Sequence, residues 1–99
     1  MLVYAVDRPE LPPLKMPDRF RMQIVYFITP SGHHGVPTLP AGEYWIRLDD
    51  AQKWLEDMVV LVVSPLDAAS KAEIELTEEQ EAWLEWLVQN RVEHVRLGP

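Results

Sequence analysis

An uninterrupted apolar run of six residues, Met58-Val-Val-Leu-Val-Val63, ends at Ser64-Pro65. Four of its six residues are valine, so the run has no polar side and is rich in β-branched residues. A short run of this kind, closed by a proline, predicts a strand that is covered on both faces rather than a helix. We therefore expect the remaining elements to be arranged as layers around it.

Apolar residues alternate with polar ones in several other segments, which is the period of a strand. The segments that follow this period are residues 20–28, 43–48 and 71–76, and we also expect short strands at residues 2–6 and 92–97. In residues 20–28 the alternation places Phe20, Met22, Ile24, Tyr26 and Ile28 on one face. Because residues 43–48 follow after an irregular segment, we expect the two strands to pair as an antiparallel hairpin with a long loop.

Two segments have the spacing of amphipathic helices. Residues 49–57 begin at Asp49 and have Gln52 three positions later, which is the spacing of a capping box. Residues 77–90 begin at Thr77 with Gln80 in the same relation, carry glutamates in the first turn and end at Asn90, which is a suitable left-handed stop.

These elements predict one domain that spans residues 1–99. Its fold class is α+β, with a mixed or mainly antiparallel sheet of about five to six strands and two helices packed largely on one face. Four prolines in residues 7–19 indicate an extended connector, which we expect Leu11, Leu14 and Met16 to hold on the domain. Residues 29–42 form a loop rich in glycine and proline that is long enough to deserve scrutiny for function.

The net charge of the chain argues against two classes of binding partner. The sequence has 9 Lys and Arg against 16 Asp and Glu, for a net charge of −7. Because nucleic acids and anionic membranes are bound through clusters of basic residues, neither is an expected partner. The absence of cysteine excludes disulfides and thiolate metal sites. No apolar segment approaches the roughly 20 residues of a membrane span. We therefore expect a cytoplasmic protein.

One short segment carries candidate chemistry, namely Ser31-Gly32-His33-His34-Gly35. Histidine is the commonest metal ligand, so His33 and His34 could hold one ion. Zinc needs three or four ligands, however, and only folding could bring His94, Glu43 or Asp49 to them. A solvated turn is the simpler interpretation, and a Ser31/His33 nucleophile pair lacks a third residue that would orient it. We therefore expect neither an enzyme nor a cofactor.

The aromatic residues point to a different function. The chain has four tryptophans in 99 residues, and Trp and Tyr are enriched where proteins meet. Trp45 lies on the polar side of its predicted strand, Trp86 at the border of its helix face and Phe27 on the second face of strand 20–28. We expect a non-enzymatic interaction module that self-associates through these residues. A homodimer is one form that this self-association could take. The alternatives are a metal- or ligand-binding domain on the His33-His34 loop and an acidic inhibitor of a basic protein.

Overall fold

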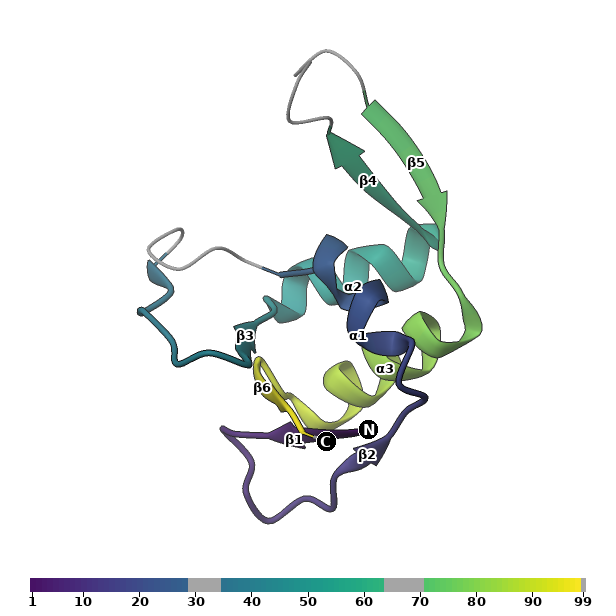
Figure 1. The fold of residues 1–99 in the computed structure, drawn as a ribbon. Coiled ribbons are helices and arrows are strands. Elements are labelled where there is room, and N and C mark those ends of the chain that lie inside the picture. The colour runs from purple at the N-terminus through teal and green to yellow at the C-terminus, as the bar shows by residue number, and fades with distance from the viewer. Residues whose placement is uncertain (29–34, 64–70, 99) are drawn as a thin grey trace.

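A four-stranded antiparallel sheet lies at one end of the molecule (Figure 1). The computed structural model describes residues 1–28, 35–63 and 71–98 of the 99-residue chain. The sheet has the order β2-β1-β6-β3 and consists of β1 (Leu2–Ala5), β2 (Leu14–Lys15), β3 (Glu43–Trp45) and β6 (His94–Leu97). The predicted strands at 2–6 and 92–97 are thus confirmed, and they pair with each other with Val3 opposite Leu97.

The predicted partner of β3 is wrong. Residues 43–48 were expected to pair with residues 20–28, but β3 pairs with β6, with Trp45 opposite His94. Only residues 43–45 form a strand, and Ile46 is buried where the chain turns into the next helix.

Residues 20–28 are helical, which contradicts the predicted strand. They form α1 (Phe20–Gln23) and a single 3₁₀ turn, η1 (Ile24–Tyr26). The residues that face the core are therefore spaced by four and three positions rather than by two, and they are Phe20, Ile24 and Phe27. A segment with seven apolar residues in nine satisfies both periods, so the alternation could not distinguish between them.

The two predicted helices are confirmed, with corrections at their ends. α2 (Leu48–Asp57) begins after Arg47 rather than at Asp49, and Asp49 and Asp50 lie in its first turn. The side chain of Arg47 does not cap the helix; the backbone N–H of Leu48 donates to Oε2 of Glu93 at 3.1 Å instead. α3 (Glu78–Asn90) begins with the expected capping box of Thr77 and Gln80. Its left-handed stop is Arg91 rather than Asn90.

The run at 58–63 forms a strand, but not one that is buried on both faces. β4 (Val59–Val63) pairs only with β5 (Lys71–Glu75) in the part of the chain that the structure describes, and the two make an antiparallel hairpin that projects from the rest (Figure 1). Val60 is buried against the core, whereas Leu61 on the opposite face is 53% exposed. Met58 lies outside the strand, in a left-handed conformation that ends α2.

The predicted α+β class is confirmed, although the described strands form two antiparallel sheets instead of one. α3 lies over the larger sheet, and its buried residues Trp83, Leu84 and Leu87 share one apolar core with Val3 and Val95. Leu11 and Leu14 pack against this core and Met16 is buried in it, so residues 7–19 run along the domain. None of the helices in the described ranges has the length and apolar character that a membrane crossing requires.

Candidate functional site

His33 and His34 lie outside the residues that the structure describes, so their metal site stays a prediction. In the described ranges, no group of three or more His, Asp or Glu side chains is placed to hold a metal ion. Two of the residues considered as additional ligands contact each other instead, because Nε2 of His94 lies 2.7 Å from Oε1 of Glu43. Asp49, the other residue considered, lies in the first turn of α2.

The three aromatic residues expected at an interface are placed in different environments. Phe27 is 1% exposed and packs edge-on against Trp54 and Trp83, so it belongs to the core and is not available at the surface. Trp45 is half-buried, with its ring centre 5.5 Å from that of His94. Trp86 is half-buried on α3 and packs against the core. The exposed apolar surface is therefore formed by other residues.

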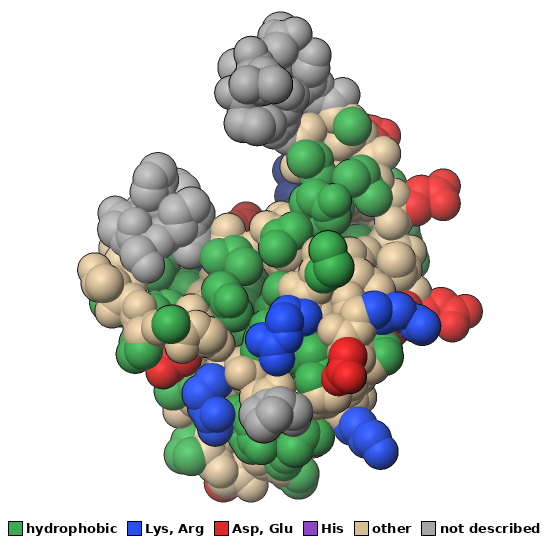
Figure 2. All heavy atoms as spheres, in the orientation of Figure 1, with side chains coloured by type: hydrophobic (Ala, Val, Ile, Leu, Met, Phe, Trp, Pro, Cys, Tyr) green, Lys and Arg blue, Asp and Glu red, His purple; other side chains and the backbone are tan. Residues whose placement is uncertain are grey.

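A stripe of exposed apolar side chains runs along the outer side of α1 and η1. We call it the α1 stripe, and it consists of Met22 (81% exposed), Val25 (57%) and Tyr26 (43%). The opposite side of the same segment is buried in the core. Hydrophobic side chains gather over α1 and the hairpin on the face shown in Figure 2. Seven of the nine residues in 20–28 are apolar, which is more than the core-facing side of the segment can hold, so the surplus apolar side chains lie at the surface.

Two arginines lie beside the α1 stripe. Helical spacing places Arg21 one turn before Val25 on one side of the stripe, and Arg19 one turn before Met22, whose backbone N–H donates to the carbonyl oxygen of Arg19. Arg21 donates a hydrogen bond to the carbonyl oxygen of Gly98, and Arg19 forms an ion pair with Glu79. Both side chains stay exposed, but Glu79 neutralises Arg19 whereas Arg21 contacts an uncharged carbonyl oxygen, so the positive charge beside the stripe rests mainly on Arg21.

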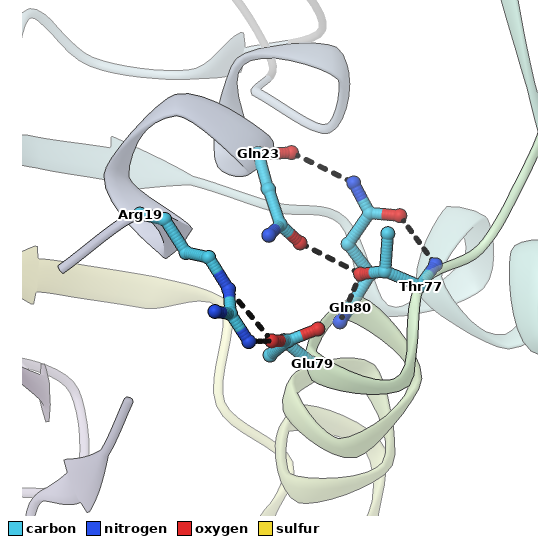
Figure 3. A network of polar contacts seen from close by, with 5 residues as sticks. All are labelled: Arg19, Gln23, Thr77, Glu79 and Gln80. Atoms are coloured by element: carbon cyan, nitrogen blue, oxygen red, sulfur yellow. Dashed lines mark hydrogen bonds and ion pairs between the residues drawn. The ribbon is translucent and has the colours of Figure 1, made fainter. Parts of the chain in front are cut away.

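A network of hydrogen bonds fixes α1 to the start of α3 (Figure 3). Nε2 of Gln80 donates to the carbonyl oxygen of Gln23 at 3.1 Å, and Oγ1 of Thr77 donates to Oε1 of Gln23 at 2.6 Å. The hydrogen bond from Arg19 is the main cause that lowers the pKa of Glu79 below its ordinary value. The short α1 helix therefore holds its orientation through the capping residues of a longer helix.

The second exposed apolar surface is a hollow of about 320 Å³ between α2 and the hairpin. We call it the α2 groove. Its lining combines apolar side chains with a mainly acidic border and consists of Asp50, Lys53, Trp54, Asp57, Val59, Leu61 and Glu73. Three carboxylates against one ammonium group make this groove electronegative, in contrast with the border of the α1 stripe.

Both surfaces were missed from the sequence because their elements were misassigned. The segment that carries the stripe was expected to be a strand with Met22 and Tyr26 on its covered face, and Leu61 was expected inside a central strand. The sequence does contain one indication of an exposed apolar surface. Residues 20–28 are apolar at more positions than a helix or strand with a single buried face requires.

Comparison of the chain with protein-family models, with curated proteins and with solved structures finds no match.

Proposed function

We propose that the protein is a non-enzymatic interaction module that self-associates through the α1 stripe. The observation that carries this proposal is the two-sided apolar character of α1 and η1. One side holds Phe20, Ile24 and Phe27 in the core, and the other side exposes Met22, Val25 and Tyr26. Exposed apolar side chains that are grouped on one element, rather than scattered, are characteristic of protein contact sites.

The energetics support a contact that is larger than the stripe alone. Full burial of a side chain such as Val or Met contributes roughly 1.5–3 kcal/mol. Loss of translational and rotational freedom costs about 4–15 kcal/mol, so three partly exposed side chains need further contacts around them. Arg21 at the border of the stripe is positioned to supply such contacts to an acidic surface.

The test is sedimentation of the wild-type protein and of a Val25→Asp variant over a range of about 1 µM to 1 mM, which spans weak to moderate affinities. We expect the wild type to sediment faster as its concentration rises. Val25→Asp should weaken association by at least about 30-fold, as expected for a central interface residue.

The matched control is Val6→Asp, which places the same charge at an exposed valine that follows strand β1. This variant should associate like the wild type. A wild-type protein that stays monomeric over the whole range would refute the proposal, as would equal effects of the two variants.

A further inference from the structure

We propose that the α1 stripe of one molecule docks into the α2 groove of a second copy, so that the association is head-to-tail. This inference rests on the proposed self-association and adds which surface of the second copy receives the stripe. It follows from two apolar surfaces on one chain that differ in charge and lie on different elements.

The groove offers an apolar floor to the stripe. Trp54 of α2 is half-buried, Val59 is half-buried and Leu61 is 53% exposed, and all three line the hollow of about 320 Å³. The stripe stands outward on a short helical segment, whereas the groove is recessed between a helix and a hairpin. Burial of the stripe against these side chains would cover both exposed apolar surfaces at once.

The charges at the borders are complementary. Arg21 carries the positive charge beside the stripe, where Arg19 is paired with Glu79. The groove is bordered by Asp50, Asp57 and Glu73. Contact between two stripes would instead bring the arginines of both copies together. Contact between two grooves would bring their carboxylates together. Because like charges across an interface are costly and opposite charges select the partner, the stripe fits the groove better than it fits a second stripe.

The two surfaces do not compete for the same part of the molecule. Residues alternate between the two faces of a strand, so Val59 and Leu61 lie on the opposite face of the hairpin from Val60, which is buried in the core. The stripe and the groove therefore share no side chain, although Phe27 after the stripe packs against Trp54 of the groove. A contact between two different surfaces leaves one of each free in a dimer, so association continues beyond two copies unless the arrangement closes into a ring.

Mixing of two variants tests this arrangement. Val25→Asp impairs the stripe and leaves the groove intact, while Leu61→Asp impairs the groove and leaves the stripe intact. Each variant alone should stay monomeric at concentrations where the wild type forms species larger than a dimer. An equimolar mixture should form a dimer and nothing larger, because one intact stripe then meets one intact groove. We expect the mixed pair to associate at least about 30-fold more tightly than either variant with itself.

Several outcomes would overturn the inference while leaving self-association standing. The mixture could remain monomeric although the wild type associates, which would indicate that Val25 and Leu61 contribute to one and the same contact rather than to two complementary surfaces. Leu61→Asp could also associate like the wild type, which would show that the groove is not used.

Both substituted side chains are exposed, and thermal melts of each variant at low concentration confirm that it is folded. A second groove variant, Asp57→Lys, reverses a charge at the border, and it should weaken association without lowering the melting temperature, because a basic residue suits the C-terminal end of α2. A wild type that never associates would instead refute the proposed function itself.

Discussion

Gln80 is the residue on which the attachment of α1 depends. Its side chain is 2% exposed and forms hydrogen bonds in two directions. Oε1 accepts from the backbone N–H of Thr77 at 2.9 Å, which completes the capping box, and Nε2 donates to the carbonyl oxygen of Gln23. A single buried amide thus joins the start of α3 to the end of α1, and the direction of the α1 stripe follows from it.

Gln80→Ala should therefore destabilise the protein by about 1–2 kcal/mol, since it removes a cap contact and leaves the partly buried carbonyl of Gln23 without its donor. The measurement is urea unfolding. The matched control is Gln89→Ala, an exposed position of the same helix, which should change stability by less than about 0.5 kcal/mol. Equal effects at the two positions would show that the network contributes nothing.

At the scale of elements, the sequence predicted local structure well where only one period fitted. The spacing correctly predicts α3 and β5, and the capping box of Thr77 is located correctly. Residues 20–28 and 58–63 were misjudged because nearly every position is apolar, and then periodicity cannot say which face is covered. In both segments the surplus of apolar residues is exposed at the surface, as Met22 and Leu61 show.

Val60 and Leu61 are adjacent in the hairpin, but the first side chain is buried and the second is exposed, so substitutions at the two positions should differ in their effect on stability. Val60→Ala should destabilise the protein by about 2 kcal/mol, because two methyl groups leave a packed core. Leu61→Ala should change the stability of the monomer by less than about 0.5 kcal/mol, since its side chain is largely exposed. Unfolding is followed at low protein concentration, so that association does not contribute. A cost of similar size at both positions would support a strand covered on both faces and contradict the projecting hairpin.

At the scale of the whole molecule, the uneven distribution of charge along the chain acquires a spatial meaning. Residues 1–48 have five basic and four acidic residues, and residues 49–99 have four basic and twelve acidic ones. The fold places Arg19 and Arg21 beside the α1 stripe, and Asp50, Asp57 and Glu73 beside the α2 groove. One molecule thereby carries two apolar surfaces with opposite borders, which is the basis of the head-to-tail proposal.

This arrangement could not be predicted from the sequence because it depends on contacts between distant segments. β3 pairs with β6, which lies far from it in the chain. β4 and β5 pair with each other in a sheet of their own, although periodicity alone would allow β4 to pair with other strands. The expectation of self-association through an aromatic face came from composition. In the structure, Phe27 is buried, Trp45 and Trp86 are half-buried, and Tyr26 is the aromatic member of the exposed stripe.

The most direct test of the central claim is methyl NMR of the wild-type protein labelled at methionine, recorded on dilution from about 1 mM to 10 µM, a range that spans weak association. Met22 lies in the α1 stripe, whereas Met16 is buried in the core and serves as an internal control. We expect the Met22 methyl resonance to shift on dilution while that of Met16 stays in place. A Met22 resonance that is the same at every concentration would contradict an interaction surface on α1.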